Sequence, residues 1–380
     1  MEPIRPVASA DLPLVSADSH VVEPGDVWTS RMDRRWGDRT PRVVVGHRGQ
    51  PGAVFVCEDV PPFGIAAFSG ADVAPEELPS HFTKGYERVR PGGWDPTARL
   101  RDQERDGVVA EVIYPSLALQ LFRIRDAEFQ AATFRAYNDW LAEFCGHAPG
   151  RLAGVALIPL HDVSLGVAEL ERAARLGLRG VMIWSSAPDD RPYSDPAYEP
   201  FWAAAEGARL PLSLHLGTGA VPLGGTAGML AVAYMFTHHA AQRSIVQMIF
   251  GGVLERHPVL RIVSVENDIG WIPHYLDRLD HAGDKFRAFH PHLGLRPSEY
   301  FRRQVAATFQ EDRIGILLRD AVGREGLLWA SDYPHTDSTW PRSREVIARD
   351  FADVPAAELR SIVCDNAARL YGLEPGYSIP

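Results

Sequence analysis

Residues of the types that bind metal ions stand together near the start of the chain. Asp18, His20 and Glu23 follow the apolar run Leu12–Val15, and Pro24 ends the segment. In an extended strand alternate side chains share a face, so we expect Asp18 and His20 to point the same way. Carboxylate and imidazole groups at this spacing predict half of a metal site. The alternative is a strand end whose polar groups only satisfy nearby backbone, and the motif alone does not decide between them.

Further residues of the same types follow apolar segments later in the chain. His215 ends one such segment, Glu266 ends another, and Asp332 follows a third, with His335 three residues beyond it. Each has a structural alternative: a core histidine, a helix cap or part of a turn. Buried charges are costly unless they pair or bind a metal ion. Their shared position after apolar strands therefore predicts a metal site.

The elements that must position these residues alternate regularly along the chain. Short apolar segments predict eight strands, and helical spacing predicts a helix after each of them. Repeated strand–helix units favour a parallel sheet, and eight of them favour a (β/α)8 TIM barrel, whose active site lies at the C-terminal strand ends. The predicted strands are 14–20, 108–114, 154–159, 180–184, 212–216, 261–266, 304–308 and 326–331. The predicted helices are 97–106, 126–147, 165–176, 197–208, 230–255, 272–286, 312–322, 342–350 and 356–371.

Residues 28–96 are rich in Pro and Gly and predict an excursion from a single barrel domain spanning residues 1–380. Residues 42–47 and 53–58 within it predict a hairpin. Its aromatic side chains are candidates for a lid over an apolar ligand, although ordinary hairpin packing uses the same residues. These are Phe55, Phe63, Phe68, Phe82, Tyr86 and Trp94.

Bulk composition excludes several classes of protein. The formal charge of −10 and the lack of a basic stripe argue against nucleic-acid binding. Three scattered cysteines do not make a disulfide framework. No apolar run approaches membrane-spanning length and no leader pattern precedes the first strand, so we expect a cytoplasmic protein without membrane contact. Neither a dinucleotide fingerprint nor a phosphate-binding loop is present.

Several of these motifs resemble the amidohydrolase superfamily. The likeness lies in Asp18-Ser19-His20, His215, Ser331-Asp332-Tyr333-Pro334-His335 and Gly251–Pro258, and it is strongest to the branch that includes the aminocarboxymuconate semialdehyde and γ-resorcylate decarboxylases. The resemblance implies that Asp18, His20, His215 and Asp332 bind metal, and it suggests a homodimer.

Two departures from the superfamily pattern stand out. Many binuclear members bridge their metal ions with a lysine on the fourth strand, but residues 180–184 contain none, and the only lysines are Lys84 and Lys285. The decarboxylase-like branch usually has a histidine base at the end of the sixth strand, where this chain has Glu266. The added carboxylates favour iron, because paired irons are held by Glu, Asp and His.

A second resemblance extends this interpretation. Asp18-x-His20-x-x-Glu23, His238-His239, Glu266 and Asp332 resemble a small group of amidohydrolase-related barrels that activate dioxygen with two irons. The type case is the monooxygenase of platensimycin and platencin diterpenoid biosynthesis. The resemblance implies two iron ions, dioxygen, antibiotic biosynthesis and an apolar small-molecule substrate, with a coenzyme A thioester as one candidate.

The main prediction is accordingly a di-iron monooxygenase with Glu266, Asp332 and His335 as catalytic groups. Adjacent helical residues point about 100° apart, so at most one of His238 and His239 is expected to face the site. The alternative is a zinc or manganese hydrolase or non-oxidative decarboxylase acting on a small carboxylated substrate, with Asp332 carrying a proton. A third interpretation is a barrel that binds no metal and serves as a scaffold.

Overall fold

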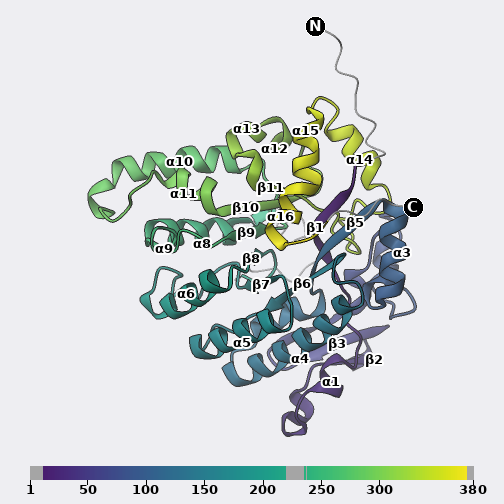
Figure 1. Cartoon of the computed structure of the whole chain (residues 1–380). Coiled ribbons are helices and arrows are strands. Elements are labelled where there is room, and N and C mark those ends of the chain that lie inside the picture. Colours follow the sequence, from purple (N-terminus) through teal and green to yellow (C-terminus); the bar gives the residue numbers. More distant parts are fainter. Residues whose placement is uncertain (1–11, 220–234, 237, 375–380) are drawn as a thin grey trace. The chain divides into compact units, whose positions relative to one another are not determined.

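The computed structural model describes residues 12–219, 235–236 and 238–374, and this part of the chain contains an eight-stranded sheet (Figure 1). The order along the sheet is the order along the chain, as a (β/α)8 barrel requires, so the predicted fold class is confirmed. The strands are β1 (Leu14–His20), β5 (Val108–Tyr114), β6 (Leu152–Leu157), β7 (Gly180–Ile183), β8 (Leu212–His215), β9 (Ile262–Val265), β10 (Val305–Phe309) and β11 (Leu327–Trp329).

The chain divides into two compact units. The first comprises Met1–Val155 with Leu328–Pro380, and the second comprises Ala156–Leu327. Parallel pairing joins β1 to β5 in the first unit, and β7, β8, β9 and β10 to one another in the second. The prediction of a single domain stays a prediction.

The first strand, β1, carries polar residues even though every residue in it is buried. Its register against β5 shifts between Ser16 and Ser19, the mark of a bulge, and bulges re-aim side chains. The Ser16 hydroxyl donates to the Asp18 carbonyl oxygen at 2.8 Å and accepts from the backbone N–H of Ser331 at 2.8 Å. The serine therefore satisfies backbone groups in the stretch that precedes the candidate ligands.

Aspartates begin several of the helices. Asp95, Asp126 and Asp162 each accept backbone N–H groups of the first turn, which is the usual N-cap arrangement. They precede α3 (Pro96–Asp106), α4 (Ala127–Gly146) and α5 (Val163–Arg175). The later helices are α6 (Glu199–Ala208), α8 (His238–Phe250), α9 (Val253–Arg256), α10 (Ile272–Lys285), α11 (Pro297–Gln304), α12 (Arg313–Leu317), α13 (Arg319–Val322), α14 (Ser343–Asp350), α15 (Ala356–Arg360) and α16 (Asn366–Tyr371).

Three predicted helices are interrupted. Within 230–255, residues 230–234 and 237 lie outside the described residues, and α8 is separated from α9 by Gly252, whose φ of +75° no helix accommodates. The segment 312–322 forms α12 and α13, separated by Leu318. A π-helical turn, Ser361–Asp365, separates α15 from α16.

The excursion forms a three-stranded antiparallel sheet of β2 (Arg42–Val45), β3 (Ala53–Cys57) and β4 (Val60–Gly64), preceded by α1 (Val27–Arg31) and followed by α2 (Leu78–His81). The predicted hairpin is confirmed as β2 and β3. Sequence reasoning missed β4 because two prolines argue against a strand, and both are tolerated here on a sheet edge.

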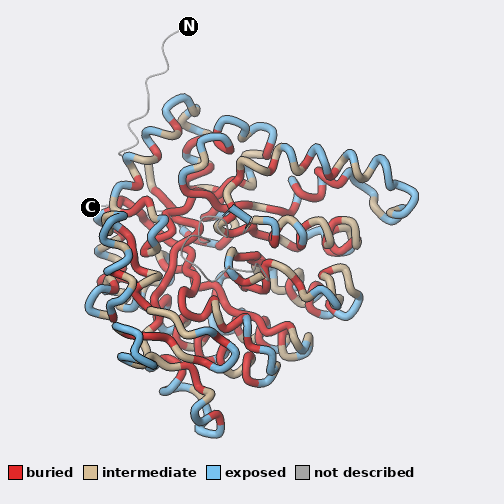
Figure 2. Tube along the Cα trace, turned by 180° about the vertical axis from the view of Figure 1, so that it is seen from behind, coloured by how far each residue is buried: buried red, intermediate tan, exposed pale blue. Residues whose placement is uncertain are grey.

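Burial follows the layers expected of alternating strands and helices. β1, β5, β6, β7, β8 and β9 are buried along their whole length. Figure 2 shows buried and exposed stretches alternating along the coiled segments of the chain. No helix in the described ranges is both long and apolar enough to cross a membrane.

Candidate active site

The last residue of β1, His20, is fixed on both edges of its ring. Its Nδ1 lies 2.6 Å from the Pro115 carbonyl oxygen, and because a carbonyl only accepts, Nδ1 carries the hydrogen. Its Nε2 lies 3.3 Å from Asp18 Oδ1 and 3.2 Å from Asp332 Oδ1, and all three side chains are fully buried. Burial alone would lower the pKa of His20, but the two facing carboxylates raise it well above its ordinary value. One imidazole nitrogen thus faces two buried carboxylates.

The second carboxylate, Asp332, lies three residues beyond β11. Its φ of +54° is a conformation that aspartate and asparagine tolerate better than most residues. Its N–H donates to the Asp18 carbonyl oxygen at 2.9 Å, which ties the ends of β11 and β1 together. Burial opposes its ionisation, but the facing imidazoles of His335 and His20 hold the pKa of Asp332 below its ordinary value. His20, Asp332 and His335 offer ligand atoms that all lie within 4.8 Å of one another.

The imidazole of His335 lies between Asp332 and a serine that sequence reasoning missed. It stacks on His20 with ring centroids 3.8 Å apart, and its Nδ1 lies 3.2 Å from Asp332 Oδ1. Its Nε2 lies 2.9 Å from the Ser116 hydroxyl. Burial, with the neighbouring charge of His20, lowers the pKa of His335. Its side chain is 12% exposed, whereas those of Asp332 and Ser116 are fully buried. His335 is therefore the member of this row that reaches solvent.

A buried ion pair lies directly behind His20. Arg99 Nη1 donates to the His20 carbonyl oxygen at 2.6 Å, and Arg99 Nε donates to Glu111 Oε2 at 2.5 Å. The other oxygen of Glu111 accepts from the Ser19 hydroxyl at 3.1 Å. Arg99 is fully buried and Glu111 nearly so. The buried Arg99–Glu111 pair therefore holds the end of β1 in place through the hydrogen bond to the His20 carbonyl.

Glu23, a predicted metal ligand, uses its carboxylate for another purpose. Its oxygens accept the backbone N–H groups of Leu117 at 2.8 Å and Ala118 at 3.0 Å, at the start of the short helix η6 (Leu117–Arg123). Burial raises the pKa of Glu23 to about 7, against the effect of these hydrogen bonds. It belongs to neither metal-capable group of the described residues. Glu23 thereby holds the segment that carries Ser116.

The second unit positions His215 and Glu266. His215 ends β8, is fully buried, and its Nδ1 donates to the Leu216 carbonyl oxygen at 2.8 Å. Glu266 follows β9 with a φ of +58°, and its N–H donates to the Thr308 hydroxyl at 2.8 Å. Glu266 Oε2 lies 3.7 Å from His215 Nδ1. Both residues thus stand at C-terminal strand ends, as predicted from the sequence.

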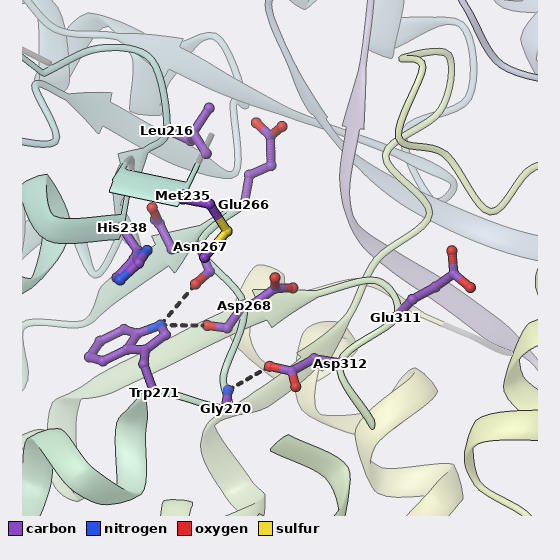
Figure 3. A pocket seen from close by; sticks show the side chains of 10 residues that line it. All are labelled: Leu216, Met235, His238, Glu266, Asn267, Asp268, Gly270, Trp271, Glu311 and Asp312. Carbon is purple, nitrogen blue, oxygen red and sulfur yellow. Dashed lines mark hydrogen bonds between the residues drawn. The ribbon is translucent and has the colours of Figure 1, made fainter. Parts of the chain in front are cut away.

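A pocket of about 270 Å³ opens beside Glu266 in this unit. Its lining consists of Leu216, Met235, His238, Glu266, Asn267, Asp268, Gly270, Trp271, Glu311 and Asp312 (Figure 3). His238 belongs to this lining, whereas His239 is exposed, with its Nδ1 3.2 Å from the Phe236 carbonyl oxygen. Of these two adjacent histidines, only His238 therefore lines the pocket together with Glu266.

Three residues of the site had a weak sequence signal or none. Ser116 follows β5 and Pro115 at the end of the second barrel strand, and a lone serine after a strand gives no signal of a site. Asn267 stands beside Glu266, where a polar residue after a strand is typical of a helix cap. Arg99 lies in a helix rich in charged residues, where nothing marks it as buried.

The sequence matches the family profile described as Amidohydrolase over residues 70–373. The chain belongs to the amidohydrolase family. This confirms the superfamily assignment made from the strand-end motifs.

Several proteins that are similar to this chain are decarboxylases. The γ-resorcylate decarboxylase of Rhodococcus jostii (strain RHA1) is 29% identical over 259 residues, which cover 63% of this chain and 76% of that protein. The solved 5-carboxyvanillate decarboxylase of Sphingomonas paucimobilis is 25% identical, with a TM-score of 0.67 over 96% of this chain and all of that one. The dihydroxybenzoic acid decarboxylase of Polaromonas sp. JS666, solved with bound manganese and 2-nitroresorcinol, shares the fold at 18% identity, with a TM-score of 0.68 over 97% of this chain and all of that one.

The predicted di-iron monooxygenase is wrong, because these relatives are decarboxylases. The predictions of oxidoreductase activity, iron and antibiotic biosynthesis are therefore wrong as well. The relatives give no support for dioxygen or a coenzyme A thioester as a partner. The iron interpretation counted Glu23 among the ligands, and the structure shows that its carboxylate accepts backbone N–H groups. The predicted set of metal ligands stays a prediction. The expected homodimer stays a prediction.

Proposed function

We propose that this chain is a metal-dependent, non-oxidative decarboxylase of a small carboxylated substrate, with aromatic acids as the first class to test. One observation carries the proposal: His20 Nε2 lies between carboxylate oxygens of Asp18 and Asp332 at 3.3 and 3.2 Å, all fully buried. The names of the relatives supply the reaction class.

The residues of this cluster fit a divalent cation. Within the described ranges, neither oxygen of the Asp332 carboxylate accepts a well-formed hydrogen bond, although the group is fully buried. A buried carboxylate in this state is costly unless a cation compensates it. Imidazole nitrogens with carboxylate oxygens suit zinc or manganese, and manganese is bound by the Polaromonas relative.

We assign Asp18, His20 and Asp332 to this ion. The Pro115 carbonyl keeps the hydrogen of His20 on Nδ1 and turns Nε2 toward the carboxylates, as metal-binding histidines require. The bound ion supplies positive charge that orients and polarises the substrate carboxylate. Glu23 and His239 are left out of the set because of the contacts described above.

The proton that decarboxylation needs has a route through the chain's own side chains. In this reaction the substrate carbon gains a proton, its bond to the carboxylate carbon breaks, and CO2 leaves. His335 reaches solvent and its Nδ1 lies 3.2 Å from Asp332 Oδ1, so a proton can pass from His335 to Asp332 and then to the carbon. The Ser116 hydroxyl is hydrogen-bonded to His335 Nε2 at 2.9 Å and holds the ring in this orientation.

The excursion supplies an apolar wall next to His335. Rings of Trp28, Phe55, Phe63 and Phe68 follow one another with centroids 5.3 to 5.4 Å apart, and Phe68 lies 5.7 Å from His335. Apolar surroundings disfavour a charged carboxylate relative to neutral CO2, so they assist its loss.

The test is an anaerobic assay of the protein loaded with manganese or zinc. We expect CO2 release from hydroxybenzoates such as 2,6-dihydroxybenzoate or 5-carboxyvanillate, detected by mass spectrometry of the decarboxylated product. Removal of the metal by a chelator should abolish turnover, and the added ion should restore it. Metal-loaded protein that hydrolyses amides or esters but leaves every carboxylic acid intact would replace decarboxylation with the hydrolytic chemistry named for the family.

A further inference from the structure

Ser116 immediately precedes the short helix η6 but does not cap it. A serine in this position usually accepts an N–H group of the first helical turn through its hydroxyl. Here the Ser116 side chain makes no such bond, and its hydroxyl lies 2.9 Å from His335 Nε2 instead. The serine is fully buried. Its hydroxyl therefore serves the histidine and not the helix.

The carboxylate of Glu23 takes the place of the missing serine cap. Its Oε2 accepts the Leu117 N–H at 2.8 Å, and its Oε1 accepts the Ala118 N–H at 3.0 Å. Ala118 is the second residue of η6, and its N–H is one that a capping serine would accept. The two oxygens of one side chain thus satisfy N–H groups that would otherwise attract the Ser116 hydroxyl.

This arrangement costs more free energy than an ordinary cap. Glu23 is fully buried, and burial raises its pKa to about 7 in spite of the backbone hydrogen bonds. A cap made by the Ser116 hydroxyl would need no buried carboxylate. What the carboxylate adds is a serine hydroxyl that remains available to His335.

The backbone of Glu23 is held in turn by the excursion. The Tyr86 hydroxyl donates to the Glu23 carbonyl oxygen at 2.6 Å, and the Val22 N–H donates to the Gly93 carbonyl oxygen at 2.8 Å. Tyr86 and Gly93 both lie within the excursion, residues 28–96. The carboxylate therefore extends from a fixed backbone, as a group that orients others must.

We propose that Glu23 is a positioning residue of the reaction, which keeps the Ser116 hydroxyl bonded to His335 Nε2. With Nε2 held in this way, Nδ1 of His335 stays directed at Asp332 Oδ1, 3.2 Å away. The effect on turnover rests on the proposed function, whereas the bond between Ser116 and His335 can be measured without turnover.

The first experiment is side-chain NMR of the zinc-loaded full-length protein with ¹⁵N-labelled histidine, in which His335→Phe assigns the His335 signals. Glu23→Gln leaves a single acceptor oxygen, so one helical N–H loses its partner and attracts the Ser116 hydroxyl. We expect the His335 Nε2 resonance to shift in Glu23→Gln in the direction seen in Ser116→Ala, by at least half as much. An unchanged resonance would overturn the proposal.

The second experiment measures decarboxylation by the same variants. We expect Glu23→Gln to lower kcat about fivefold with KM within about twofold of wild type, because the substrate is still bound. Glu23→Gln combined with Ser116→Ala should be no slower than Ser116→Ala alone, because both act through one hydrogen bond. Effects that multiply would overturn the proposal. Loss of metal content in Glu23→Gln would also overturn it, by making Glu23 a ligand.

A matched control comes from another glutamate of the excursion. Glu87 is exposed and accepts the Gly85 N–H at 2.9 Å, so Glu87→Gln weakens a similar bond away from Ser116. It should change neither the His335 resonance nor kcat, and a shift equal to that of Glu23→Gln would contradict the proposal. If Glu23→Gln does not fold, Tyr86→Phe replaces it, because it frees the Glu23 carbonyl. We expect a smaller shift of the same sign, and no shift would overturn the proposal.

The failures of the two proposals are distinguishable. A His335 resonance that responds to Glu23→Gln in a protein that decarboxylates no acid would refute the proposed function and leave the role of Glu23 standing. Wild-type turnover of an acid, with a resonance and kcat unchanged in Glu23→Gln, would refute the role of Glu23 alone.

Discussion

Two regions of the molecule use the same residue types for different ends. In the first unit His20, Asp18, Asp332 and His335 are packed together with contacts of 3.2 to 3.3 Å, and three of the four are fully buried. In the second unit His215 Nδ1 and Glu266 Oε2 lie 3.7 Å apart, and Glu266 lines a pocket together with Asp268, Glu311 and Asp312. Ligand atoms as close together as those of the first unit suit a metal ion, whereas among the described residues no group of three such atoms within 4.8 Å includes Asp268, Glu311 or Asp312. The spacing and burial of these side chains, more than their types, therefore determine whether a region suits a metal ion.

The supports of the two regions differ as well. The first rests on the buried Arg99–Glu111 pair and on a carbonyl that orients His20. The second rests on a neutral amide and an indole bound to backbone carbonyls. Substitutions that remove charge should consequently damage the first region more than the second.

The largest effect is expected for Asp332→Asn. Asparagine keeps the shape and tolerates the backbone angle, but it removes both a proposed ligand charge and the proton carrier. We expect kcat/KM for decarboxylation to fall by at least about 10³-fold, with reduced metal content measured by elemental analysis. Asp320→Asn, at an exposed ion pair, is the matched control and should leave both unchanged. Activity within tenfold of wild type would remove Asp332 from the mechanism.

Loss of the support behind His20 should appear as lost stability. Glu111→Gln leaves the Arg99 charge buried without its partner, which costs roughly 3–5 kcal/mol. Chemical denaturation of the metal-free protein measures this change. Glu128→Gln breaks an exposed pair with Arg35 and should cost under about 1 kcal/mol. Similar losses of stability in the two variants would mean that the buried Arg99 pair stabilises the fold no more than the exposed pair does.

A smaller effect on turnover separates proton transfer from metal binding. His335→Phe keeps a ring stacked on His20 but removes the proton carrier, so we expect kcat to fall about 10²-fold while metal content is retained. Ser116→Ala removes only the hydrogen bond that orients His335 and should cost about tenfold. Metal lost together with activity in His335→Phe would instead make His335 a ligand.

The smallest effect concerns pH and a carboxyl away from the cluster. Burial raises the pKa of Asp106 to about 6, against hydrogen bonds from Ser343. The folded state then holds a proton that the unfolded state has released, so this group lowers stability as pH rises from about 4 to about 6. Asp106→Asn removes that loss. Its stability relative to wild type should rise by roughly 3 kcal/mol across the window and stay constant above it. A difference independent of pH, measured by denaturation at each pH, would contradict this account.

Some features of the site were predictable because their signals are local. The apolar runs that became β1 and β5 match the predicted bounds, and Asp18, His20, His215, Glu266 and Asp332 were predicted to lie at strand ends. Proline and glycine signals identified the excursion but hid β4, whose prolines are tolerated only because of where the strand lies in its sheet.

What the amino-acid sequence alone determined is the alternation of strands and helices and the polar residues that end the strands. Hydrophobic periodicity and turn chemistry act between near neighbours, so they can be read along the chain. Tertiary structure decided the partners of those residues. Glu23 bonds to Leu117, Ser116 bonds to His335, and His238 rather than its neighbour His239 lines a pocket with Glu266. These residues are far apart in the chain, so they make contact only in the folded protein. Their contacts distinguish a carboxylate that faces a histidine from one that accepts backbone N–H groups.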